Sequence, residues 1–253
     1  MARNKLRSLT SMITNDVVVT IKNSQKKKFT KKLPGRMQMY DWNAFVDKEP
    51  DIPEEESGFV VRLNVKFEDC DEPIISAAVG EKVSGEICMW INVSLSGKQQ
   101  MNAVYTTLLG VIRHEIEHLT MFGSLSMAGP KCKNEKHSAL RKSLHDINRR
   151  RALFSKNADK DEWLKEELIR CEDGRKGDIF SYITCYDELG PFVAGFHTQA
   201  VAERATFESI AAAYVNSFVE SEQITDTHAK IALGWFKIWE NDKYGKVNNQ
   251  VHI

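Results

Sequence analysis

The sequence predicts an α+β fold: a small, mostly antiparallel sheet, then a long helix, then a largely helical C-terminal half. Residues 59–67 and 86–95 alternate between apolar and polar side chains, as half-buried strands do. Residues 99–123 instead carry apolar side chains at helical spacing. The later part of the chain is compatible with further helices at residues 135–154, 159–171, 192–219 and 226–239.

The two alternating segments each place their apolar residues on one face. In the first strand these residues are Phe59, Val61, Leu63, Val65 and Phe67, and in the second they are Ile87, Met89, Ile91, Val93 and Leu95. A shorter strand is expected at residues 74–79, between turns at 68–73 and 80–85. A sheet of this kind leading into a helix is typical of α+β proteins.

Length and composition indicate one large domain with an appendage. The chain has 253 residues, of which 42% are hydrophobic, and this is ample for a core. We expect a basic N-terminal arm at residues 1–40, with a short strand at 16–21, and a single domain at residues 41–253. Residues 26–32 hold five lysines, which could contact phosphates or form a solvated loop. The solvated loop is favoured, because no other basic cluster lies near it in the sequence.

Charge and cysteine content restrict the class of partner. The 35 basic and 35 acidic residues balance, so nucleic acid is not an expected partner. The five cysteines form no Cys-x-x-Cys pair and are odd in number, which favours a reduced, intracellular protein. No signal-like apolar segment follows Met1 and no apolar run approaches the length of a membrane span. A cytoplasmic protein without membrane contact is therefore expected.

The chemistry is expected at a His-Glu-x-x-His sequence made of His114, Glu115 and His118. Residues four apart on a helix lie on the same face, one turn above each other. Two imidazoles placed in this way can bind one Zn²⁺, and Glu115 can take a proton from a water molecule on the metal.

The helix around these residues is amphipathic. Leu108, Val111, Ile112 and Leu119 form a broad apolar arc, and the two histidines lie at its border. The opposite side, expected to be solvated, holds Arg113, Glu117 and Thr120. This arrangement favours a metal-binding helix, and the alternative is a surface helix whose His and Glu side chains are only solvated.

His114, Glu115, His118 and the apolar helix around them resemble the zinc-binding helix of the zincin metallopeptidases. In that family the strand before the metal helix lies at the sheet edge, so the resemblance implies that residues 86–95 line the substrate. An ordinary core strand is the alternative. The metzincin pattern would place Gly and a third His where this chain has Met121 and Ser124, so the third ligand must come from elsewhere.

Two positions stand out as the third metal ligand. Glu135 follows Asn134, an Asn-Glu pair that resembles the thermolysin-like pattern, but lysines surround it and it comes only 17 residues after His118. Glu188 lies in residues 182–194, which resemble a segment of phage and bacterial metallopeptidases of the gluzincin type. There a Tyr-rich lead-in ends in Glu-x-x-Ala-(Phe/Tyr) and opens a long apolar helix. The full set of candidates is Glu135, His137, His145, Asp146, Asp187, Glu188, His197, Glu203 and Glu208.

The resemblance favours Glu188, with Glu135 or a histidine as alternatives. Asp187 is the expected N-cap of the following helix, with Pro191 in its first turn and helix-compatible sequence as far as residue 219. The chain departs from the family pattern at Gly190, where the pattern has a second Glu.

The expected function is zinc-dependent hydrolysis of a peptide bond in a protein or peptide substrate. Glu115 would act as general base, and Tyr186 is the expected donor to the substrate oxygen, with Tyr182 and His197 as alternatives. If the chain is phage-encoded, the compartment would be the host cytoplasm or the virion.

Two other functions remain open. One is a zinc amide hydrolase of the deformylase or amidase type. Peptide deformylases have an upstream Cys ligand, for which Cys88 is the only plausible residue here, and its surroundings do not match that family's pattern. The other is a non-catalytic phage structural or accessory protein that keeps a metal-binding helix.

Overall fold

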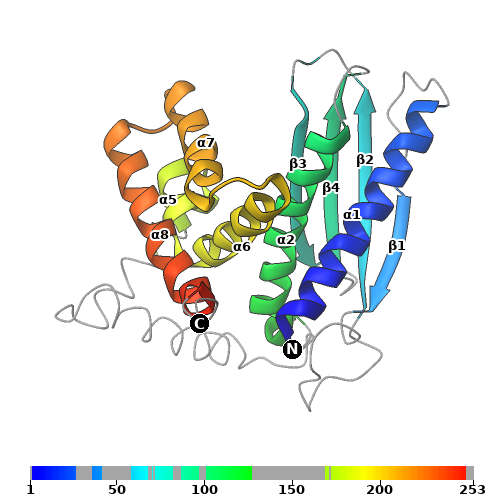
Figure 1. Ribbon diagram of the computed structural model, residues 1–253, viewed down its shortest axis with the longest axis horizontal. Coiled ribbons are helices and arrows are strands. Elements are labelled where there is room, and N and C mark those ends of the chain that lie inside the picture. The colour runs from blue at the N-terminus through cyan, green and yellow to red at the C-terminus, as the bar shows by residue number, and fades with distance from the viewer. Residues whose placement is uncertain are drawn as a thin grey trace. The chain divides into compact units, whose positions relative to one another are not determined.

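The computed structural model describes residues 2–26, 36–41, 58–67, 70, 72–81, 87–96, 101–126, 169–170 and 172–248. The chain divides into two compact units, residues 1–136 and residues 137–253. The described part of the first unit combines a sheet with two helices, and that of the second is helical (Figure 1). The predicted mixture of a small sheet and a mostly helical remainder is therefore confirmed.

The sheet of the first unit has four strands in the order β1-β2-β4-β3. These are β1 (Arg36–Asp41), β2 (Gly58–Phe67), β3 (Ile74–Glu81) and β4 (Ile87–Leu95). The sheet is mostly antiparallel, as predicted: the β1–β2 and β3–β4 pairs are antiparallel, whereas β2 and β4 run parallel. Strand β1 was not predicted from the sequence.

The edge position implied for residues 86–95 is wrong. Strand β4 forms ladders with β2 on one side and β3 on the other, so its backbone groups are already paired within the sheet. Because β3 folds back onto β4, the strand before the helix that carries His114 becomes internal, and β1 and β3 are the edges among the described strands.

The predicted alternation of the strands is confirmed by burial. The odd-numbered residues 59–65 of β2 and 89–95 of β4 lie in the core of the first unit, and Phe67, Ile75, Ala77 and Val79 pack against it. The register lines them up in cross-strand rows: Val61, Met89 and Val79; Leu63, Ile91 and Ala77; Val65, Val93 and Ile75.

Helix α1 (Ala2–Lys26) occupies most of the segment predicted as a basic arm. Its side chains Leu9, Ile13, Val17 and Ile21 recur every four residues and lie in the core of the first unit. The short strand predicted at residues 16–21 is therefore wrong. The run of three valines there favours a strand by propensity, but burial of one helical stripe outweighs that preference. Residues 27–32 of the lysine-rich segment lie outside the described residues.

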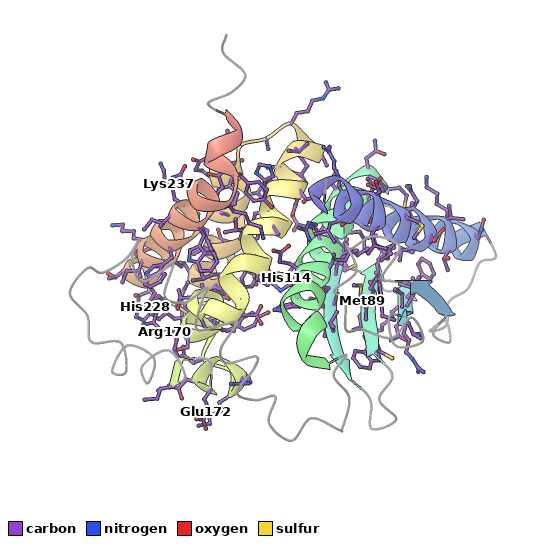
Figure 2. The ribbon with its side chains drawn as sticks, turned by 90° about the horizontal axis from the view of Figure 1, so that it is seen from below. Met89, His114, Arg170, Glu172, His228 and Lys237 are labelled. Carbon is purple, nitrogen blue, oxygen red and sulfur yellow. The ribbon has the colours of Figure 1, made fainter. Side chains whose placement is uncertain are left out.

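Helix α2 (Met101–Ser126) confirms the long helix predicted at residues 99–123. Its residues Val104, Leu108, Ile112 and Ile116 are fully buried in the same core as α1 and the sheet. Both helices cover one face of the sheet (Figure 1). Figure 2 shows Met89 on the sheet and His114 on α2.

The second unit contains α5 (Ile179–Thr184), α6 (Tyr186–Glu203), α7 (Phe207–Glu220) and α8 (Asp226–Asn248). Helix α8 confirms the helix predicted at residues 226–239 and extends it. The helices pack around aromatic and aliphatic side chains that include Phe192, Phe196, Phe207, Phe236 and Trp239.

The continuous helix predicted at residues 192–219 is instead two helices. Arg204 adopts a left-handed conformation with φ of 55°, which ends α6. Thr206 then caps α7, because its hydroxyl oxygen accepts a hydrogen bond from the Ser209 amide at 3.1 Å. The helix predicted at residues 135–154 lies outside the described residues.

None of the helices in the described part of the chain combines the length and the apolar character that crossing a membrane requires.

Two valines of α1 provide a matched test of its place in the core. Val17 is 4% exposed and Val19 is 53% exposed, although both belong to the same helix. Val17→Ala should lower the free energy of unfolding by about 1–3 kcal/mol, because it removes buried methyl groups. Val19→Ala should change it by less than about 0.5 kcal/mol. Chemical denaturation measures both, and equal effects would mean that α1 does not pack as described.

Candidate metal centre

His114 and His118 bring two potential metal-ligand atoms close together. They lie one turn apart on α2, and their Nε2 atoms are 3.0 Å from each other. The ring planes are inclined at 70°, so the two imidazoles meet edge to face rather than stacking. Each residue is only 8% exposed. Two imidazole nitrogens that converge in this way are suited to hold one transition-metal ion.

Glu115 places a carboxylate beside this pair. Its Oε1 atom lies 3.9 Å from the Nε2 atom of His114, and the residue is 5% exposed. A buried carboxylate is costly unless positive charge or hydrogen bonds compensate it. A cation held by the two histidines would supply that compensation.

The expectation that Arg113 and Glu117 lie on a solvated side of the helix is wrong. Arg113 is buried, and its Nη2 atom lies 2.6 Å from Oε2 of the mostly buried Glu117. Helix α2 contacts α1 as well as β3, so it is covered on more sides than a single apolar arc indicates. The i,i+4 pair allows both charged groups to be buried next to the histidines.

Glu188 occupies the first turn of α6. The helix begins at Tyr186 and its N-cap is Cys185, which makes no side-chain cap hydrogen bond, so the prediction of Asp187 as N-cap is wrong. A carboxylate in the first turn is favoured by the positive end of the helix dipole.

The earlier start of α6 also moves Pro191 into the helix interior. Proline has no N–H, so the carbonyl oxygen of Asp187 receives no helical hydrogen bond from position 191. The turn that carries Glu188 is still held by its amides, because those of Glu188 and Leu189 both donate to the carbonyl oxygen of Cys185 at 3.1 and 3.0 Å.

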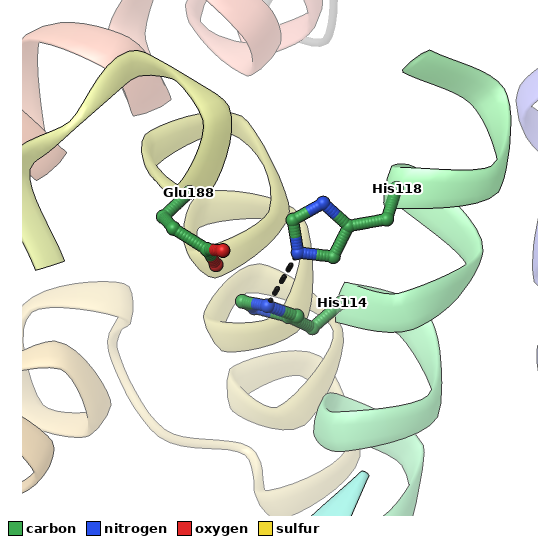
Figure 3. Close-up of side chains that lie close together, drawn as sticks. All are labelled: His114, His118 and Glu188. Atoms are coloured by element: carbon green, nitrogen blue, oxygen red, sulfur yellow. Dashed lines mark hydrogen bonds between the residues drawn. The ribbon is translucent and has the colours of Figure 1, made fainter. Parts of the chain in front are cut away.

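The ligand atoms of His114, His118 and Glu188 all lie within 4.8 Å of one another (Figure 3). Two imidazole nitrogens and one carboxylate oxygen are a donor set typical of catalytic zinc, which keeps a further position open. The three residues are thus close enough to bind a metal ion, and they are the three ligands predicted from the sequence. No other group of three such residues was found in the described part of the chain.

The other candidate ligands do not join this group where they can be placed. His197 lies beside Glu240, with 3.8 Å between Nδ1 and Oε1, and stacks on Tyr244. Glu203 accepts a hydrogen bond from Gln199. Glu208 is exposed in the first turn of α7. The remaining candidates, Glu135, His137, His145 and Asp146, lie outside the described residues.

The predicted oxygen donors have different positions. Tyr186 is the first residue of α6, but its side chain lies outside the described residues, as does that of Asp187. Tyr182 packs edge-on against Phe192, with 5.6 Å between ring centroids. Tyr214 of α7, which no sequence pattern singled out, has its pKa raised by burial and, secondarily, by the negative charge of Glu188.

Comparisons with known proteins found no family model, curated protein or solved structure that matches this chain.

The buried Arg113–Glu117 pair gives a test of the surroundings of the histidines. Glu117→Ala should lower the free energy of unfolding by about 3 kcal/mol, because it leaves the Arg113 guanidinium buried without its partner. The matched control is Glu172→Ala, which breaks an i,i+4 pair with Lys176 in which both side chains are exposed. That variant should unfold at the same denaturant concentration as wild type. If Glu117→Ala were equally harmless, α2 would have the solvated side that its sequence suggests.

Proposed function

We propose that this chain is a zinc-dependent metallopeptidase of the zincin type, which hydrolyses peptide bonds. The observation that carries the proposal is the pair of buried Nε2 atoms, 3.0 Å apart on α2, with the Glu115 carboxylate beside them. The proximity of Glu188 to both histidines supports the same conclusion.

In this proposal His114, His118 and Glu188 hold the ion. When bound, zinc supplies a Lewis acid that activates water and stabilises negative charge on the substrate oxygen. Glu115 accepts the proton of the attacking water and returns it to the leaving amine. Its position on α2, directly after one ligand and three residues before the other, keeps its carboxylate beside the reacting water. Tyr186 remains the proposed donor to the substrate oxygen.

An extended peptide substrate would pair with β3. This strand is the edge of the sheet next to β4 among the described strands, and α2 packs against it. Its Ile74 side chain is 62% exposed, and Ser76 and Ala78 are exposed as well. A strand that is paired on one side only can accept a further extended chain through its backbone groups.

The deformylase-type alternative is less well supported, because Cys88 lies on the wrong face of the sheet. The odd-numbered neighbour Met89 points toward the core that α2 covers. Successive residues of a strand point to opposite faces, so Cys88 points away from α2 and its histidines. Cys88 is buried, but it is not part of the group of candidate ligands.

The first experiment is metal content by elemental analysis of wild type, His114→Ala, Glu188→Ala and Glu115→Gln. Wild type should hold about one zinc per chain. The three proposed ligands form one set, and one catalytic zinc takes three protein ligands. His114→Ala and Glu188→Ala should each lose most of it. Glu115→Gln should keep the metal but lose cleavage of a protein substrate such as casein by about 100-fold or more.

Each outcome decides between the alternatives. Casein cleavage that survives in Glu115→Gln would contradict the mechanism. Zinc retained in Glu188→Ala would move the third ligand to another residue. Zinc binding without cleavage of casein or of a peptide library would favour the non-catalytic protein. Preferential hydrolysis of formyl-peptides would favour the deformylase class.

A further inference from the structure

We propose that His197, Glu240 and Tyr244 form a proton-dependent clasp that holds the last turns of α8 against α6. His197 lies on α6, and the other two residues lie one turn apart on α8, which packs against α6 (Figure 1). All three belong to the second unit, and none is among the three proposed metal ligands. The inference therefore goes beyond the proposed function and does not depend on it.

The last turns of α8 follow the part of the helix that is anchored in the core of the second unit. The anchoring side chains are Ala229, Ala232, Phe236 and Trp239. After Trp239, the side chains of α8 whose burial is described are only partly buried or exposed. A helix end with few buried contacts opens locally at a low cost in free energy. A change in one or two contacts can therefore shift how often these turns are attached.

Two groups on α8 meet the imidazole of His197. The Oε1 atom of Glu240 lies 3.8 Å from Nδ1 of the imidazole. The ring of Tyr244 stacks on the other side chain's face, with 3.9 Å between ring centroids and 4° between ring planes. Glu240 and Tyr244 thus hold the imidazole through a carboxylate and an aromatic face at once.

A proton on His197 strengthens both contacts. The imidazolium attracts the Glu240 carboxylate, and its positive charge lies over the electron-rich face of the Tyr244 ring. Two neutral rings gain less from a nearly face-to-face arrangement, because aromatic pairs prefer offset or edge-on contacts. The flat stacking therefore suits the charged form of His197 better than the neutral form.

The other described charges near the clasp come from α7 and α8. Burial, and then the charge of Glu208 on α7, raise the pKa of Glu240, whereas Lys237 lowers it. Lys243 lies 6.0 Å from the centre of the Tyr244 ring. Two carboxylates thus favour a proton on His197 and two ammonium groups oppose it. The 3.8 Å contact with Glu240 and the stacked ring favour the protonated form.

The clasp has a defined pH range. Imidazole ordinarily titrates at about pH 6.5, so the positive charge is present on the acid side and is lost as the pH rises. The raised pKa of Glu240 means that its carboxylate loses its charge at a higher pH than an ordinary glutamate does. Both charges are therefore present around pH 6, and the attraction is lost by about pH 8.

Hydrogen exchange measured by mass spectrometry on the full chain tests the clasp. After correction for intrinsic exchange rates, peptides covering residues 240–245 should lose protection about 3- to 10-fold between pH 6 and pH 8, as expected for one ion pair and one cation–π contact. Peptides from α7 are the internal reference and should keep their protection. In His197→Gln, residues 240–245 should show the lower protection at both pH values. Glu240→Gln should reduce the pH dependence, because only the stacking contact remains.

His228→Gln is the matched control. His228 lies near the start of α8 and stacks on Phe180, with 4.3 Å between ring centroids, so its loss should leave the pH dependence of residues 240–245 as in wild type. The same pH dependence in His197→Gln would assign it to another group and overturn the inference. Equal protection of residues 240–245 at both pH values in wild type would overturn it as well. Circular dichroism of each variant checks that the helices are retained.

Discussion

Helix α2 must pack one apolar row into the core of the first unit and also hold two histidines in fixed positions. Its row of Val104, Leu108, Ile112 and Ile116 anchors it to the sheet and to α1. His114 and His118 lie on another side of the same helix, about 120° round from the middle of that row. Because the anchoring residues flank the histidines along the chain, the core restrains the backbone that carries them. The 3.0 Å separation of the two Nε2 atoms follows from a rigid helix rather than from a loop.

Charge burial is the cost of this arrangement, and the chain offsets it with local pairs. The carboxylate of Glu115 lies beside the imidazoles, and Glu117 neutralises Arg113 one turn away. Both members of each pair belong to α2. The charged groups are therefore already paired within the helix when it packs against α1 and β3. A metal cation would complete this balance by placing positive charge next to Glu115 and the histidines. The same balance explains why these polar residues tolerate surroundings that usually exclude ionised groups.

The second unit contributes a different kind of support. Its aromatic core fixes α6 and α7 against each other through Phe192, Phe196 and Tyr214. Glu188 stands at the beginning of α6, where the helix dipole favours its negative charge and where Pro191 interrupts the hydrogen-bond ladder. The Glu188 and Leu189 amides both donate to the carbonyl oxygen of Cys185, so this first turn is hydrogen-bonded, and the packed residues that follow anchor it.

The sequence by itself determined the features that repeat locally. Alternation in residues 59–67 and 86–95 predicted two strands and their buried faces, helical spacing predicted α2, and the four-residue spacing of His114 and His118 predicted their convergence. Glu188 was reached by resemblance to a family and not by periodicity.

Tertiary structure decided what depends on partners distant in the chain. Packing of one stripe made residues 16–21 helical despite their β-branched valines, because burial outweighs intrinsic propensity. Pairing with β2 and β3 made β4 internal, and contacts of α2 with α1 and β3 accompany the burial of Arg113 and Glu117. Local patterns report which face of an element is apolar, whereas its neighbours depend on long-range contacts that the patterns do not contain.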